Sequence, residues 1–218
     1  MRLNTDQTRR TLVHGALLPW VASPVAGVQR RMLYRDGEEK ARATSLVRYA
    51  AGSTFRPHSH PGGEEFLVLE GIFQDERGDY PAGTYVRNPP GSSHAPASTS
   101  GCEIFVRLQQ FEKDDGHECV VYPDQHQTHS DTRTLFSGHD EHVTLHDCPA
   151  GTMLELSNEA GLELLILSGS AVENGDLLQP LSWLRLPPGI ALRAMIGNAG
   201  ARIWIKRRRT TDSVAEPS

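Results

Sequence analysis

The sequence predicts an all-β protein built from two tandem units of barrel or sandwich type. Short apolar or alternating runs are separated by Gly, Pro and Asn along the chain, and no apolar stripe at helical spacing is sustained. The chain has 218 residues, which is long enough for two units of about 100 residues each. An internal repeat favours two units over one large domain.

Eight strands are expected, four in each half, because these runs combine alternation with flanking turn residues. In the first half they are Thr44–Tyr49, Glu65–Glu70, Thr84–Arg87 and Glu103–Leu108. In the second half they are Thr152–Leu156, Leu162–Leu167, Ser182–Leu186 and Arg202–Lys206. The two sets follow one another in the same order.

Three pairs of segments establish the repeat. Residues 66–71 correspond to 164–169, residues 85–91 to 183–189, and residues 101–107 to 200–206, at an offset of 98 or 99 residues in each pair. Turn residues alone would not keep such a constant offset. We therefore expect a first domain at residues 1–112, a second at 113–209 and a polar tail at 210–218.

Composition and charge exclude several classes of protein. Hydrophobic residues make up 38% and charged residues 22% of the chain, as in soluble globular proteins. A net charge of −5 argues against nucleic-acid binding, so the basic run Lys206–Arg209 is interpreted as a solvated chain end. No apolar run is long enough to span a membrane. Cys102, Cys119 and Cys148 form no CxxC pair, so neither a disulfide framework nor a thiolate zinc site is expected, and a cytoplasmic location is predicted.

A group of metal-ligand residues stands out in the first half. His58 and His60 are two residues apart, so on a strand both imidazoles emerge on the same face. The turn at 61–63 can return the carboxylate of Glu64 toward the two rings, and His94 comes from a separate strand. Three nitrogens and one carboxylate suit a borderline divalent metal: zinc is the expected ion, with iron, manganese and nickel as alternatives.

The spacing of these residues resembles that of the cupin superfamily. Gly52-x5-His58-x-His60-x3-Glu64-x6-Gly71 is similar to the first cupin motif, and Gly83-x5-Pro89-x-Gly91-x2-His94 to the second. The resemblance implies two jelly-roll barrels, each a double-stranded β-helix, and it implies that His58, His60, Glu64 and His94 are the metal ligands. Glu65 is a rival to Glu64, but only Glu64 keeps the six-residue gap to Gly71. The chain departs from the motif at Ser98, where the family often has Asn.

A closer resemblance, to the ChrR-type cupins, is carried by residues 44–49, 60–65 and 78–85. The name-giving members are anti-sigma factors that join a zinc-binding helical domain to a metal-binding cupin needed for the response to oxidative signals. The His-x3-Cys-x2-Cys pattern of that helical domain does not occur in this sequence. The resemblance therefore implies a sensory or regulatory cupin, and cupins commonly pair, so a homodimer is expected.

The second copy lacks the metal-ligand residues. Alignment of the repeat places Leu162 at the position of Glu64 and Leu192 at that of His94, and residues 156–159 contain no histidine. This half is expected to be a structural partner or a dimerisation surface, with an apolar ligand pocket left open as an alternative. A histidine-rich stretch is interpreted as a polar linker rather than a second metal site; it contains His126, His129, His139, His142 and His146.

Two functions from different classes remain at this point. The first is a regulatory protein of the transcriptional stress response, in which an oxidant or small ligand changes the metal site and a partner protein responds. The alternative is an iron-dependent dioxygenase of a small organic substrate, with open coordination positions for substrate and oxygen. No catalytic residue is assigned. Arg48, Tyr85 and Arg87 lie on neighbouring strands, but parity alone does not say which of them point inward.

Overall fold

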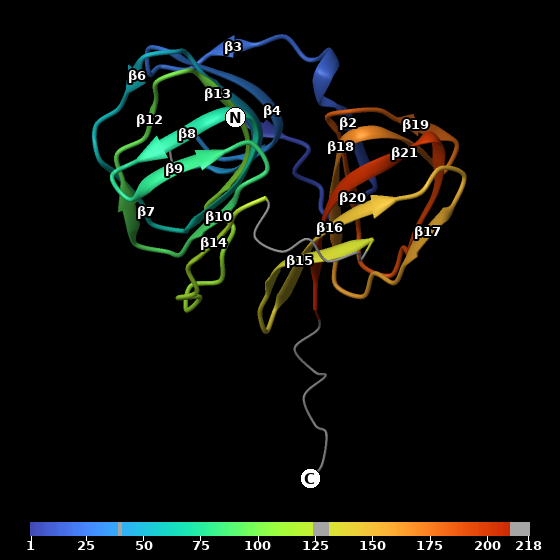
Figure 1. Cartoon of the computed structure of the whole chain (residues 1–218). Helices are drawn as coiled ribbons and strands as arrows, with labels where there is room; N and C mark the ends of the chain where they lie inside the picture. The colour runs from blue at the N-terminus through green and yellow to red at the C-terminus, as the bar shows by residue number, and fades with distance from the viewer. Residues whose placement is uncertain (39–40, 124–130, 210–218) are drawn as a thin grey trace. The chain divides into compact units, whose positions relative to one another are not determined.

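The computed structural model describes residues 1–38, 41–123 and 131–209, and almost all of its regular structure is antiparallel β-sheet (Figure 1). The helical element in this part of the chain is η1 (Gly15–Leu17), a three-residue 3-10 helix. No helix among the described residues has the length and apolar character needed to cross a membrane. The prediction of an all-β fold is confirmed.

The described chain divides into two compact units. The first contains residues 1–5 and 18–123, and the second contains residues 6–17 and 131–209. All eight predicted strands are present, with some ends extended or shifted.

The first unit is built on an 11-stranded sheet with the central order β1-β4-β5-β13-β8-β10-β14 and a separate β7–β11 pair. Its strands are β1 (Arg2–Leu3), β3 (Val21–Ala22), β4 (Val28–Asp36), β5 (Arg42–Tyr49), β6 (Ser53–Thr54), β7 (His58–His60), β8 (Glu64–Asp75), β9 (Gly78–Pro81), β10 (Tyr85–Asn88), β11 (Ser92–His94), β12 (Ala97–Ser98), β13 (Cys102–Leu108) and β14 (Cys119–Val121).

The second unit is an eight-stranded sheet with the order β15-β16-β21-β18-β20-β2. Its strands are β2 (Thr11–His14), β15 (Thr132–Ser137), β16 (Glu141–Cys148), β17 (Met153–Leu156), β18 (Leu162–Glu173), β19 (Asp176–Leu178), β20 (Ser182–Leu186) and β21 (Leu192–Arg208). The pairing β5-β13-β8-β10 of the first unit recurs here as β16-β21-β18-β20, so the sequence repeat is also a repeat of topology.

The borders of the two units differ from the expected join after residue 112. Residues 6–17 belong to the second unit because β2 pairs with β20, with Thr11 opposite Arg185. Residues 113–123 belong to the first unit because β14 pairs with β10, with Val121 opposite Tyr85. β10 and β20 are equivalent strands, so a short strand from elsewhere in the chain covers the same edge in both copies. This covering satisfies backbone groups that a bare edge strand would leave unpaired.

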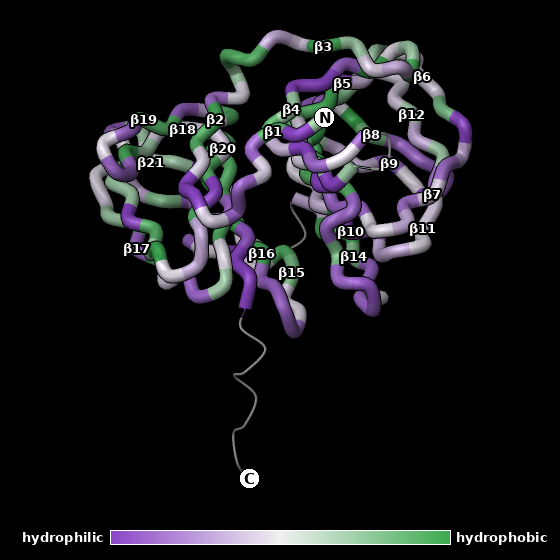
Figure 2. Tube along the Cα trace, turned by 180° about the vertical axis from the view of Figure 1, so that it is seen from behind, coloured by the Kyte–Doolittle hydropathy of each residue, from purple (hydrophilic) through white to green (hydrophobic). Residues whose placement is uncertain are grey.

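Each unit has its own apolar core. In the first unit it is formed by residues such as Phe66, Val68 and Ile104, and in the second by a leucine-rich cluster that includes Leu164 and Leu184. Figure 2 shows apolar and hydrophilic residues interspersed along the strands of both units, as expected where alternate side chains face the core.

A glycine pair marks the same bend in both copies. Gly71 and Gly169 have φ of 71° and 72°, and a Cβ at either position would collide with a backbone carbonyl oxygen, that of Gly101 or Gly200. Only glycine tolerates this combination of positive φ and close backbone approach. Both long strands, β8 and β18, therefore continue through a residue that the sequence suggests as a strand end.

Candidate metal centre

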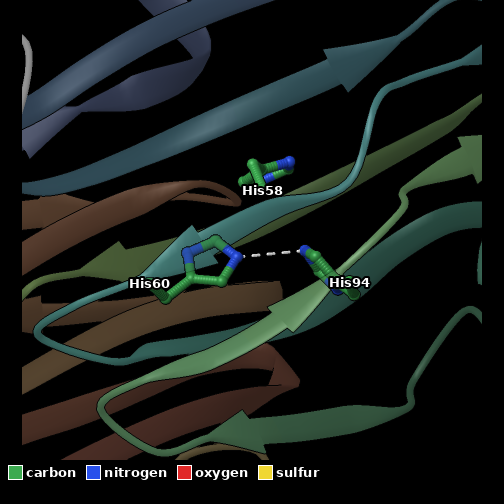
Figure 3. Close-up of side chains that lie close together, drawn as sticks. All are labelled: His58, His60 and His94. Atoms are coloured by element: carbon green, nitrogen blue, oxygen red, sulfur yellow. Dashed lines mark hydrogen bonds between the residues drawn. The ribbon is translucent and has the colours of Figure 1, made fainter.

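The three histidines reach one place because two short strands pair. β7 presents His58 and His60 on the same face, and β11 lies antiparallel to it with His94 directly opposite His58. The rings lie 4.9–5.2 Å apart between centroids. Figure 3 shows one ring nitrogen of His60 directed at one of His94, with His58 beside them.

The turn after β7 brings Glu64 to the same place. The amide of Gly63 donates to the carbonyl of His60 at 3.1 Å, and Gly63 has φ of 77°. A Cβ on Gly63 would come within 2.5 Å of the Phe111 ring, so the turn requires glycine. Glu64 then begins β8 with its side chain directed at the histidines.

The distances between the donor atoms fit one bound cation. His60 Nε2 lies 3.1 Å from His94 Nε2, and Glu64 Oε2 lies 3.5 Å from each of these nitrogens. One ligand nitrogen from each of the three histidines lies within 4.8 Å of the other two. Donors held about 2.1 Å from a metal are separated by roughly 3.0 Å in octahedral and 3.4 Å in tetrahedral geometry. Nitrogen and carboxylate ligands of this kind suit a divalent transition metal.

Burial is uneven around the centre. His60, Glu64 and His94 expose only 5%, 6% and 2% of their surface, whereas His58 is exposed. Three donors are thus held in the protein interior, and the fourth borders solvent.

Hydrogen bonds to the outer atoms orient these ligands. Asp75 Oδ2 lies 3.4 Å from His94 Nδ1, and the Arg56 carbonyl oxygen lies 3.2 Å from His58 Nδ1. With Nδ1 engaged in this way, Nε2 of each ring is left for the metal. Asn88 Nδ2 donates to Glu64 Oε2 at 3.2 Å and positions the carboxylate.

Burial and neighbouring charges set the protonation of the group. Burial lowers the pKa of His60, which keeps this ring neutral and able to bind a cation. Burial also acts to lower the pKa of His94, but the hydrogen bond to Asp75 and the nearby Glu64 outweigh it and raise this pKa. For Asp75, burial opposes ionisation, yet hydrogen bonds from His94, the Arg77 amide and Tyr80 bring its pKa to about 2. Asp75 is therefore a carboxylate at neutral pH.

Sequence reasoning missed Asp75 because of a β-bulge. Strict alternation from Glu64 places residue 75 on the opposite face of β8. However, β8 holds one more residue than β13 between the pairs Val68–Ile104 and Glu70–Glu103, and this extra residue reverses the parity beyond it. No sequence signal marks the bulge except Gly71. Asn88 also escaped notice, since only the pairing of β10 with β8 places it opposite Glu64.

Glu65, the rival of Glu64, faces the other side of the sheet. Its carboxylate pairs with Arg107 and accepts a hydrogen bond from Tyr85 at 2.6 Å. Arg87, on the same strand and face as Tyr85, pairs with Asp115. Arg48 is partly exposed and pairs with Glu103 at 2.5 Å. These interactions account for Glu65, Tyr85, Arg87 and Arg48 without a role at the metal centre.

Comparison with known proteins agrees with this fold. Residues 8–112 match the family model of the ChrR cupin-like domain. Over these residues the chain is a cupin. Its resemblance to that superfamily, inferred from the two motifs, is confirmed.

Solved structures with the same fold span nearly all of this chain. YlbA from Escherichia coli has a TM-score of 0.73 at 16% identity, covering 97% of this chain and 95% of its own. The bacterial pirin YhhW from Escherichia coli, solved with nickel(II), has a TM-score of 0.69 at 14% identity, with coverages of 91% and 98%. A candidate dioxygenase from Nostoc punctiforme has a TM-score of 0.69 at 13% identity, with coverages of 100% and 87%. No curated protein matches the cupin by sequence.

The second unit has an apolar interior where the first has its candidate metal ligands. Leu162 and Leu192 occupy the positions of Glu64 and His94, and they expose 1% and 0% of their surface within the leucine-rich core. Asn158 stands in place of His60, and its amide donates to the carbonyls of Pro187 and Ile190. Leucine offers no metal donor, so this half of the chain retains the barrel without the candidate ligand set.

The histidine-rich stretch belongs to the second unit as far as it is described. His126 and His129 lie outside the described residues. His142 and His146 lie on β16, where Thr134 contacts His142 and both Thr132 and Thr144 contact His146. Within residues 1–38, 41–123 and 131–209, the one group of three metal-ligand side chains is His58, His60 and His94. Most of the stretch is thus strand rather than linker.

Proposed function

We propose that the first unit binds one divalent metal ion through His58, His60, Glu64 and His94, and that this ion is zinc. The observation that carries the proposal is the convergence of the four donor groups from three strands, with Nε2 and Oε2 atoms 3.1–3.5 Å apart. Iron, manganese and nickel suit the same donor set. When bound, such an ion would supply a Lewis acid and open coordination positions.

The function we propose for this centre is sensory. The match of residues 8–112 to the ChrR cupin-like domain supports it, and so does the exposure of His58 beside three buried ligands. An oxidant or small molecule arriving on the His58 side would alter the ligation, and a regulatory partner protein would respond in a cytoplasmic stress pathway. Neither nucleic acid nor a membrane is a partner in this proposal.

The second candidate is an iron-dependent dioxygenase of a small organic substrate. The solvent border at His58 favours it, because substrate and oxygen need access to the ion. The candidate dioxygenase from Nostoc punctiforme has the same fold over the full length of this chain. At this low identity the likeness concerns the fold alone. The buried Asp75–His94 pair would orient one ligand in either function.

Metal analysis combined with oxygen uptake separates the two functions. The protein is purified without added metal, its metal content is measured, and oxygen consumption by the iron-loaded form is followed with a panel of small organic substrates. The sensory function predicts about one equivalent of metal and no sustained oxygen uptake. Sustained turnover would instead assign the protein to the dioxygenases.

We also propose that the protein pairs with a second copy of itself. A row of exposed apolar side chains crosses four neighbouring strands of the second unit, in register: Met153, Met195, Val172 and Leu177, each 42–50% exposed. The matching row of the first unit is more polar: Thr54, Ala97, Gln74 and Asp79. The apolar row carries no charge, and the Glu155–Arg193 ion pair beside it is neutral overall, so two copies of charge −5 can meet there with little repulsion.

Met195→Asp is expected to convert the dimer to a monomer, because it places a charge in the centre of the row. Ile190→Asp is the matched control, since Ile190 is equally exposed at 46% but lies outside the row. Light scattering over a concentration series measures the molar mass of each variant. A wild-type protein that stays monomeric would contradict this proposal, and so would dissociation by Ile190→Asp alone.

A further inference from the structure

A small cavity lies in the second unit, far in sequence from the metal ligands. It has a volume of about 110 Å³ and lies where the end of β21 meets the loop after β17. The residues that line it are His142, Ser157, Glu159, Arg207, Arg208 and Arg209. A water molecule accounts for about 30 Å³ of liquid, so the cavity has room for an ion of several heavy atoms.

Three guanidinium groups and one carboxylate border this cavity, so its lining carries an excess of positive charge. Arg209 donates to the carbonyl of Gly138 and to Ser137, which leaves part of its guanidinium for a ligand. For Arg208, the described residues provide no side-chain hydrogen bond or ion pair. Arginine donors that lack a carboxylate partner are suited to oxyanions, which they bind through two parallel hydrogen bonds.

The contact between Arg207 and His142 determines the protonation state of the histidine. Arg207 Nη2 lies 3.3 Å from His142 Nδ1, and a guanidinium can only donate, so Nδ1 accepts and the ring is neutral. The remaining ring nitrogen, Nε2, lies 3.3 Å from Thr134 Oγ1. Burial lowers the pKa of His142, and the positive charges of Arg207 and Arg209 lower it further. Two of the three guanidinium groups thus act on this ring with their positive charge.

The same place in the first unit carries no such charge. Arg207 pairs across the sheet with Leu162, as Leu108 does with Glu64, so Arg207 corresponds to Leu108. Arg208 and Arg209 then correspond to Gln109 and Gln110, and Glu159 to Pro61. The fold forms this corner without arginine in one copy, so the barrel does not require the basic cluster of the other.

We propose that this cavity binds a small oxyanion, and that its ligand is a phosphate group. The guanidinium groups of Arg207 and Arg208 would hold the phosphate oxygens, and Ser157 would add a hydroxyl donor. The site is independent of the metal centre, because none of its lining residues is a metal ligand or belongs to the first unit.

Titration with inorganic phosphate at constant ionic strength tests the proposal. The imidazole resonances of His142 are followed by NMR, with chloride as the competing simple anion and sulfate as a second tetrahedral one. Phosphate and sulfate are expected to shift the His142 signals with saturation, and chloride is not. A shift of equal size with all three anions would show charge screening without a site and would overturn the proposal.

Three substitutions are expected to change phosphate affinity in different ways. Arg208→Gln should weaken phosphate binding about fivefold without removing a hydrogen bond of the described structure, the effect of losing one partly solvated charge contact. Glu159→Gln should tighten binding, because it removes the negative charge from the lining. Arg193→Gln, on the same strand but outside the cavity, should leave binding unchanged. If Arg193→Gln weakened binding as much as Arg208→Gln, or if Glu159→Gln failed to tighten it, the cavity would not be the site.

Discussion

Replacing His94 with alanine is expected to release the metal, lowering its affinity by more than about 100-fold. Loss of an outer partner of a metal ligand already costs 10- to 100-fold, and His94 is proposed as a direct ligand. It is also the one ligand on β11 and the one tied to Asp75, so its removal opens the buried side of the centre. Metal content per chain after dialysis against a weak chelator measures the effect.

His117→Ala is the control for this prediction, because His117 is exposed, its ring lies beside Asp115, and it is not among the proposed ligands. A second variant, Glu64→Leu, separates loss of the metal from loss of the fold. The second unit places leucine at this position in an intact barrel, so the fold tolerates it. We expect Glu64→Leu to lose the metal while its circular dichroism stays that of a folded sheet protein. Full metal content in both His94→Ala and Glu64→Leu would contradict the proposed ligand set.

Replacing Arg107 with methionine is expected to destabilise the metal-free protein by about 3–5 kcal/mol, the usual cost of leaving one member of a buried ion pair alone. Arg107 and Glu65 each expose only 1% of their surface, and Arg107 also donates to Gln110 at 3.0 Å. The substitution keeps an apolar side chain of similar length but leaves the buried carboxylate of Glu65 without its charged partner. Urea denaturation followed by circular dichroism measures the free energy of unfolding.

The matched control is Arg202→Met, which breaks an ion pair with Asp147 in which both side chains are about half exposed. An exposed pair of this kind contributes less than about 1 kcal/mol. The double variant Glu65→Leu/Arg107→Leu should recover much of the lost stability, since no unpaired charge then remains. Equal losses in the free energy of unfolding for Arg107→Met and Arg202→Met would show that the buried ion pair contributes no more to stability than the exposed one.

The repeat explains why this buried layer is assigned to stability rather than to the metal centre. At the positions of Glu65, Tyr85 and Arg107 the second unit has Glu163, Trp183 and Lys206. Trp183 Nε1 donates to Glu163 at 3.2 Å, and Lys206 pairs with Glu141 at 2.6 Å while exposing 4% of its side chain. The second unit has thus kept a polar layer on this face of the sheet although it has leucine in place of two of the proposed metal ligands. A layer that persists without the metal residues serves the packing of the strands.

Most of the metal centre could be predicted because its geometry is local. Alternation along one strand places His58 and His60 on a single face, and a glycine turn of three residues returns Glu64 toward them. His94 required the family spacing, since nothing in the sequence alone says that β11 pairs with β7. The choice between Glu64 and Glu65 likewise rested on spacing, and the sheet register then separated the two to opposite faces.

The unit borders could not be predicted, because they depend on which edge a short strand joins. β2 and β14 are only four and three residues long, and neither has a pattern that names its partner. β2 pairs with β20 and therefore belongs to the second unit, and β14 pairs with β10 and therefore belongs to the first, so each lies on the other side of the expected boundary at residue 112. Edge pairing depends on which backbone N–H and C=O groups remain unpaired after the sheets form, and the periodicity of the side chains does not indicate these groups.

By itself the sequence determined the all-β class, the duplication and the grouping of the three histidines, since each of these follows from residue type and spacing along the chain. The tertiary structure decided what depends on register between distant strands: the bulge in β8 that turns Asp75 toward His94, the burial of Glu65 against Arg107, and the gathering of three arginines around a cavity beside His142. A shift of one residue moves a side chain to the other face of a sheet, so such contacts are settled only when the strands pair.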